Sequence, residues 1–280
     1  MVLEALLNPR KAEKKPWELF FLGIIYVSFS FLLSYWVFKA NWGLSIVTLT
    51  AICSVPLVYN IFLLEESKDN MPKKEYWLLK EHGKAVSSLM FLFLGFAAAF
   101  FVWYMVLPSA TTQEVFKSQI DTISQISTTT PTGLLISNIG HVGLVLMNNL
   151  KILIFCFILS FFFGAGAIFV LTWNASVVAV AMGMFVKNSI LSQISPSIAV
   201  YSQAISMGLL KYFTHGLIEI FAYFVGALAG GILSIAVINH HYKTAEFRKV
   251  LLDSIDVLAV SVIILCVAAL VEVFVTPIII

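Results

Sequence analysis

Charged residues are scarce in this chain. Only 11% of its 280 residues are Asp, Glu, Lys or Arg, whereas about 25% of a soluble domain is charged. Hydrophobic residues make up 60% of the chain, and the mean hydropathy is +0.96. This composition excludes an ordinary soluble domain, and nothing in the sequence suggests nucleic-acid binding. The sequence therefore predicts an integral membrane protein embedded in a lipid bilayer.

Metal-binding cysteine pairs and common catalytic signatures are also missing. The three cysteines, Cys53, Cys156 and Cys266, lie inside apolar segments without CxxC spacing, so we expect no disulfide and no metal site there. The chain has no glycine-rich phosphate loop, no HExxH and no GxSxG. His240 and His241 are adjacent and would point in different directions on a helix, which is unsuitable for a metal pair. We therefore predict no cofactor and no bound metal.

Long apolar runs indicate a polytopic α-helical bundle, because a membrane-spanning helix needs about 20 such residues. We expect spans at 17–38, 43–64, 85–107, 150–171, 216–239 and 251–276. A turn at 172–174 is expected to lead into a short apolar run, 175–186. If that run crosses the membrane, the bundle has about seven spans. If it is a re-entrant segment that dips in and returns to the same side, the bundle has six.

Basic residues favour seven spans. Twelve of the 17 Lys and Arg fall in three groups, at 10–15, 68–84 and 243–249. Loops rich in Lys and Arg remain cytoplasmic, and only an odd number of crossings places all three groups on one side. We therefore expect a multi-pass protein of the cell membrane with a cytoplasmic N-terminus and an extracytoplasmic C-terminus.

The chain divides into three parts at its one long non-membrane segment. Residues 1–108 form a predicted three-helix membrane region, 109–149 an extracytoplasmic amphipathic loop, and 150–280 a second membrane region. Apolar residues recur at near-helical spacing within 116–126, which indicates an amphipathic helix. The loop is expected to cap the bundle, with a partner-docking surface as the alternative.

Three ionisable residues lie near position 215, at the start of an apolar segment. His215 and Glu219 are spaced i, i+4 and therefore share one helix face, just before the glycine-rich run 220–238. Lys211 lies one turn earlier and adds a third ionisable group. Because a charged group in lipid is costly, it marks a functional or assembly site by default. A break near Gly216 is expected to separate two helices.

Small residues continue the same helix face. Ala222, Gly226 and Gly230 follow Glu219 in steps of three or four, and glycines at this spacing let another helix approach closely. The fourth span carries its own small residues, including Ser160 and Gly164. We expect the two stripes to pack together.

Three roles for His215 and Glu219 remain open. They can hydrogen bond to neighbouring helices and hold broken helices together. They can pass protons, since a histidine beside a carboxylate is a usable relay. Acid–base catalysis is the third role, but no second carboxylate lies at a suitable spacing on the same helix.

These motifs together resemble those of the stage II sporulation protein M family. The likeness covers about 145–240 and comprises, in order, Asn148-Asn149, Gly164-Ala165-Gly166, Asn174 and the His-Gly-x-x-Glu from His215 to Glu219. A proline often precedes that histidine in the family, whereas Thr214 stands there in this chain. The resemblance assigns polar roles to Asn149 and Asn174, and helix packing to the glycines, Gly166 included.

The resemblance also implies a non-enzymatic membrane component. In spore-forming bacteria such a protein works with cell-wall hydrolases during engulfment, and the wider family occurs in bacteria and archaea without that process. We therefore predict a scaffold or assembly subunit that contacts other membrane or envelope proteins, or further copies of itself. The alternative is a small transporter or channel with a proton or ion site at His215 and Glu219.

Overall fold

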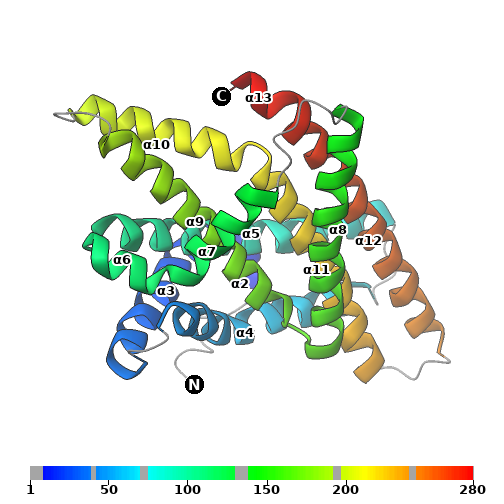
Figure 1. Ribbon diagram of the computed structural model, residues 1–280. Coiled ribbons are helices and arrows are strands. Elements are labelled where there is room, and N and C mark those ends of the chain that lie inside the picture. Colours follow the sequence, from blue (N-terminus) through cyan, green and yellow to red (C-terminus); the bar gives the residue numbers. More distant parts are fainter. Residues whose placement is uncertain are drawn as a thin grey trace.

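The computed structural model describes residues 9–38, 42–69, 75–129, 138–191, 197–239 and 244–279. All regular elements in these ranges are helices (Figure 1). They are α2 (Pro9–Lys14), α3 (Trp17–Val37), α4 (Trp42–Asp69), α5 (Glu75–Val106), α6 (Ser109–Val115), α7 (Lys117–Thr129), α8 (Asn138–Phe163), α9 (Ala167–Leu191), α10 (Ile198–Phe213), α11 (Gly216–Asn239), α12 (Ala245–Leu270), the π-helix η1 (Val271–Val275) and α13 (Thr276–Ile279).

Within the described residues, seven segments are long and apolar enough to cross a membrane. They are α3, α4, α5, α8, α9, α11 and the run from α12 through η1 into α13. The predicted all-α polytopic bundle is confirmed, with seven candidate spans. The short run 175–186 that left the count open lies inside α9, whose 25 residues are enough to cross a bilayer.

The turn before α9 corrects one predicted boundary. Helix α8 ends at Phe163 and α9 begins at Ala167, so the turn expected at 172–174 is wrong, as is the expected span 150–171. Gly164 has φ +62°, a left-handed conformation that glycine adopts without the strain a Cβ brings. The residues around this turn are as apolar as the helices, so hydropathy does not reveal it.

Helix α11 is the central helix of the C-terminal half. Fifteen of its 24 residues are buried. It packs mainly against α12 and α8, and also against α4 and α5 (Figure 1). The glycine-rich sequence explains this position, because small side chains let several neighbours approach one helix.

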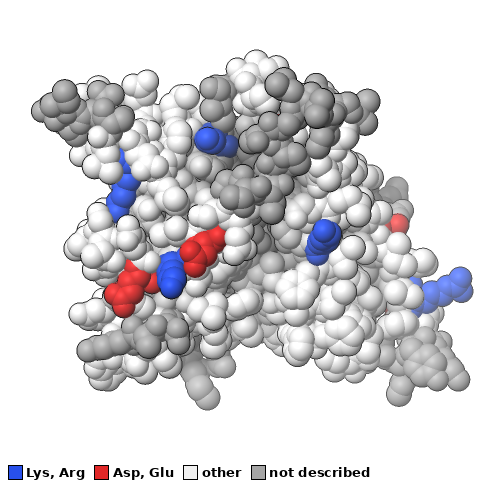
Figure 2. Space-filling view, viewed as in Figure 1, with Lys and Arg blue, Asp and Glu red and all other residues white. Residues whose placement is uncertain are grey.

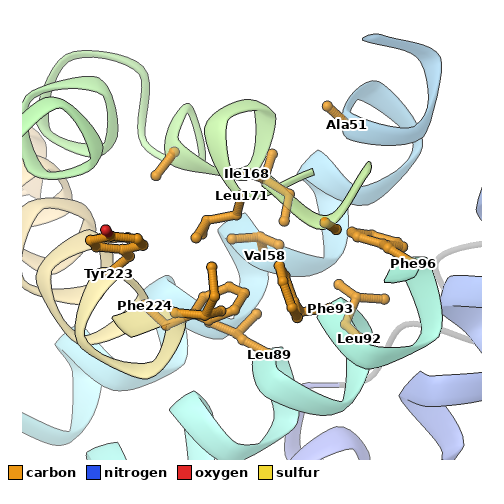
Figure 3. Close-up of a cluster of buried hydrophobic side chains, with 14 of the residues drawn as sticks. Ala51, Val58, Leu89, Leu92, Phe93, Phe96, Ile168, Leu171, Tyr223 and Phe224 are labelled. Atoms are coloured by element: carbon orange, nitrogen blue, oxygen red, sulfur yellow. The ribbon is translucent and has the colours of Figure 1, made fainter. Parts of the chain in front are cut away.

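Large apolar side chains from four helices fill the centre of the bundle. Figure 3 shows Val58 of α4, Phe93 of α5 and Leu171 of α9 meeting Phe224 of α11. The rings of Phe93 and Phe224 lie edge to face, with centroids 6.3 Å apart. This core joins the N-terminal spans to the C-terminal ones, so the two predicted membrane regions pack as one bundle.

The outer surface is largely apolar. Many large hydrophobic side chains on α3, α8 and α12 are exposed, and the face in Figure 2 carries few charged groups. In a protein with seven candidate spans, such a surface suits contact with lipid. Several charged groups of this face gather over α6 and α7 (Figure 2), two helices from the segment predicted to be an amphipathic loop.

Helix α7 confirms the amphipathic helix expected within that loop. Ile120 and Ile123 pack against the core, while the Gln119 amide donates a hydrogen bond to Ser176 Oγ of α9 at 3.2 Å. The end of the predicted loop belongs instead to α8, which begins at Asn138.

Candidate functional site

The predicted break near Gly216 is present. Helix α10 ends at Phe213 and α11 begins at Gly216. The carbonyl of His215 accepts the backbone N–H groups of Ile218 (3.0 Å) and Glu219 (3.2 Å), which starts the new helix. Glu219 therefore lies in the first turn of α11, where the helix dipole favours negative charge.

Glu219 lies near polar groups of two other helices. The Asn149 side-chain amide of α8 donates a hydrogen bond to Glu219 Oε1 at 2.5 Å. The Glu272 carboxyl lies near enough to the Glu219 carboxyl for the two groups to interact electrostatically.

Glu272 belongs to the π-helix η1, which interrupts the last span. Such π-helical turns often occur at functional sites, where they redirect a side chain. We call Asn149, His215, Glu219, Glu272 and Thr276 the polar junction. It joins α8, α11 and the end of the last span, and it includes a carboxylate that sequence spacing did not reveal.

His215 is oriented by the same segment of the last span. Its Nδ1 lies 3.2 Å from Thr276 Oγ1, and the Thr276 hydroxyl donates to the Val271 carbonyl at 3.2 Å. The Thr276 oxygen is therefore left to accept a hydrogen bond from the N–H of His215 Nδ1. This assignment leaves Nε2 of a neutral ring as an acceptor.

Two of the sequence candidates lie apart from the polar junction. Lys211 lies with its ammonium 5.2 Å from the centre of the Phe185 ring, and it forms no ion pair within the described ranges. Asn174 lies within α9, where its amide donates to the carbonyl of Val170 at 3.0 Å. Its contact is thus internal to one helix.

The small-residue stripe of α11 faces α8, as expected, but its two glycines meet Leu153 and Phe157 of α8 and not the predicted Ser160 and Gly164. A Cβ added at Gly230 would overlap the backbone carbonyl of Phe157, and one added at Gly226 would overlap the side chain of Leu153. Ala222 on the same helix is fully buried.

The small residues of the fourth span have different positions. Ser160 is fully buried within α8. Gly164 lies in the turn after α8, with Tyr59 as the neighbour of an added Cβ. Gly166 also lies in that turn, against the carbonyl of Leu159. These two glycines shape the turn and are not part of a helix face.

One comparison with known proteins identifies the family of this chain. The family model described as stage II sporulation protein M matches residues 87–277, which is more than half of the chain and includes the whole polar junction. The chain belongs to the stage II sporulation protein M family. No curated protein and no solved structure gave a match.

The family match is wider than the resemblance seen in the motifs. It begins within α5 and runs through α6 and α7 to α13. Family membership thus covers the predicted loop as well as the C-terminal spans. The first two spans and the start of α5 precede the match.

Those earlier segments contain a second group of ionisable side chains that sequence reasoning missed. Lys68 Nζ of α4 lies 2.8 Å from Glu13 Oε1 and 2.9 Å from Oε2, and 2.5 Å from Glu65 Oε1. His82 Nδ1 of α5 donates to Glu65 Oε2 at 2.8 Å. We call Glu13, Glu65, Lys68 and His82 the charge cluster.

The charge cluster is buried, although all four of its side chains are ionisable. Glu65 is fully buried, and the other three side chains are at most 11% exposed. It joins α2 to the C-terminal end of α4 and the N-terminal part of α5. The Ser88 hydroxyl of α5 also donates a hydrogen bond to the carbonyl of Ala12 in α2 at 3.1 Å. The i, i+3 spacing of Glu65 and Lys68 was the available signal, but such a pair at a span end is usually solvated.

Neither the polar junction nor the charge cluster has the ligand arrangement of a metal centre among the residues that the structure describes. There, no three His, Cys, Asp or Glu side chains come together in a way that could hold a metal ion. His240 and His241 lie outside the described residues. In the charge cluster, the Lys68 ammonium occupies the position between the two carboxyl groups.

The docking of α2 is expected to weaken as pH rises. Burial raises the pKa of Glu13 from 4.5 to about 7, and a hydrogen bond with Glu65 adds to this shift. A raised pKa favours the docked state at low pH, and this stabilisation is lost as pH rises through about 7. Thermal stability in detergent should therefore fall by a few degrees between about pH 4.5 and 7.5 and change little above that range.

Glu13→Gln provides the control for this pH dependence, because Gln keeps the side-chain shape and does not titrate. Its stability should vary less with pH over the same range than that of the unmodified chain. Equal pH dependence in the two proteins would show that Glu13 does not cause it.

Proposed function

We propose that this member of the stage II sporulation protein M family is a non-enzymatic membrane scaffold or assembly subunit. The observation that carries the proposal is the close packing of α11, whose stripe from Ala222 to Gly230 meets α8 without space for added atoms. A helix enclosed in this way suits a fixed structural support better than a conduit for ions.

The polar junction fits a structural role in the same proposal. The Asn149 amide of α8 donates to the Glu219 carboxyl, so this group has a partner within the bundle, as buried polar groups in a membrane need. The partners we propose are other membrane or envelope proteins or further copies of this chain.

Proton transfer is the second candidate, and one observation favours it. The carboxyl groups of Glu219 and Glu272 lie near one another, and His215 Nε2 is an acceptor in our tautomer assignment. The second carboxylate also meets one condition for acid–base catalysis. We keep the non-enzymatic proposal because Glu219 is hydrogen bonded to Asn149 and the stripe of α11 packs closely against α8.

Substitutions at Glu219 separate these roles. Glu219→Gln keeps an oxygen that can accept from Asn149, so folded yield and thermal stability should change little. Glu219→Leu leaves the Asn149 amide without its acceptor, which should cost ~1–3 kcal/mol. The measurements are thermal unfolding in detergent and pH-driven proton flux in liposomes, with exposed Glu114→Gln as the matched control.

The scaffold proposal expects no proton flux from the unmodified chain. Flux that is present in the unmodified chain and in Glu114→Gln, but absent in Glu219→Gln, would overturn it in favour of proton transfer. A Leu variant as stable as the Gln variant would show that Glu219 does not hold these helices together.

The proposed orientation places α7 outside the cell and the start of α12 inside. Ser118 and Arg248 are both exposed and lie on the two segments concerned. A cysteine at Ser118 should react with a membrane-impermeant thiol reagent added to intact cells, and one at Arg248 should react only after lysis. The reverse pattern would invert the orientation.

A further inference from the structure

A hollow of about 520 Å³ lies where α5 ends and α6, α7 and α9 meet. Tyr104 lines it from the last turn of α5, Lys117 from the first residue of α7, and Lys187 from the last turns of α9. Because α5 and α9 are candidate spans that both end here, the hollow lies at the level of a membrane surface.

The hollow is positively charged. Lys117 and Lys187 form no ion pair within the described ranges, and Lys187 Nζ lies over the Tyr104 ring, 4.6 Å from its centre. No Asp or Glu is among the described residues that line the hollow. Glu114 and Asp121 flank Lys117 along the chain, but both are exposed and neither lines it.

Neutral groups complete the lining. Gln113 and Asn188 bring amide donors, while Met184 and Leu191 provide apolar surface at the side formed by α9. Ammonium groups with added N–H donors suit the oxygens of a phosphate, for which lysine acts as a point charge. The adjoining apolar surface suits the chains of an amphiphile.

We propose that this hollow binds a phosphate-bearing anion, carried either by a lipid headgroup or by a soluble molecule. The proposal rests on Lys117, Lys187 and the shape of the hollow, and it does not depend on the scaffold role. It adds a ligand site on a face of the bundle that is separate from the polar junction.

The test is native mass spectrometry of the delipidated full chain in detergent. Phosphatidylglycerol, phosphatidylcholine and inorganic phosphate are added separately, and phosphate is also used as a competitor. We expect one phosphatidylglycerol to be retained per chain, in preference to phosphatidylcholine. The double variant Lys117→Gln/Lys187→Gln should bind it about 30-fold more weakly. Each lysine near an anionic membrane surface contributes about 1 kcal/mol of binding free energy, and the sum for two lysines corresponds to this factor.

Two further double variants keep the test interpretable. Lys14→Gln/Lys151→Gln removes the same charge from exposed lysines away from the hollow and should bind as the unmodified chain does. Lys117→Arg/Lys187→Arg keeps the charge and should retain binding if the Gln pair fails to fold.

The two sources of the anion give different results. Retained lipid that millimolar phosphate does not displace identifies a headgroup site, and saturable binding of phosphate with displacement of lipid identifies a soluble ligand. Absence of binding in every arm, or equal binding by the hollow variant and the Lys14/Lys151 variant, would overturn the proposal.

Discussion

Gly230→Ala is expected to destabilise the folded protein by ~1–3 kcal/mol, the usual cost of overpacking. The added methyl group would overlap the Phe157 carbonyl of α8, and the backbone N–H of Phe161 lies next to the same position. Backbone atoms cannot rotate away, so α8 and α11 must separate. Thermal unfolding in detergent should show the loss although alanine is the better helix former by ~1 kcal/mol.

Other glycines of the same helix provide matched controls. At Gly226 the added methyl group meets the flexible side chain of Leu153, which can change rotamer, so the loss should be smaller. At Gly216 no atom lies within 4 Å of an added Cβ, so alanine should be neutral or stabilising. Equal stability of the Gly230 and Gly216 variants would contradict the close contact of α8 with α11.

The sequence predicted those features whose signals are local. Apolar runs gave the spans, and the spacing of His215 and Glu219 with the glycines after them indicated the break and the packed face of α11. The turn at Gly164 was missed, because its neighbours are as apolar as a helix interior. A single φ value in the left-handed region ends α8, and hydropathy does not measure φ.

Tertiary partners were the larger omission. Glu272 meets Glu219 only because the last span folds back along α11 and contains a π-helical segment there. Likewise, Glu13 reaches Lys68 only when α2 packs onto α4. Both contacts join residues more than 50 positions apart, and no spacing rule along one chain predicts such pairs.

Glu65→Leu is expected to destabilise the chain by ~3–5 kcal/mol, the cost of removing one partner from a buried ion pair. Glu65 is fully buried and receives both the Lys68 ammonium and the His82 Nδ1. Leucine is apolar and accepts neither proton. Glu65→Gln keeps one acceptor oxygen and should lose less, whereas Leu at exposed Glu114 should have little effect. Folded yield and thermal unfolding in detergent are the measurements.

A double-mutant cycle with Lys68→Met separates the loss of attraction from the cost of an uncompensated buried charge. Each single variant leaves a buried charge with fewer partners, while the Glu65→Leu/Lys68→Met pair removes both charges of this ion pair and fills similar volumes. The pair also removes Lys68 from Glu13, but burial raises the pKa of Glu13 and so favours its neutral form. Well-packed apolar replacements of buried ion pairs are often neutral or stabilising. The double variant should therefore be more stable than Glu65→Leu alone, with a coupling energy above ~1 kcal/mol. Losses that simply add would show that Glu65 and Lys68 act independently, and the charge cluster would then not be one unit holding α2, α4 and α5 together.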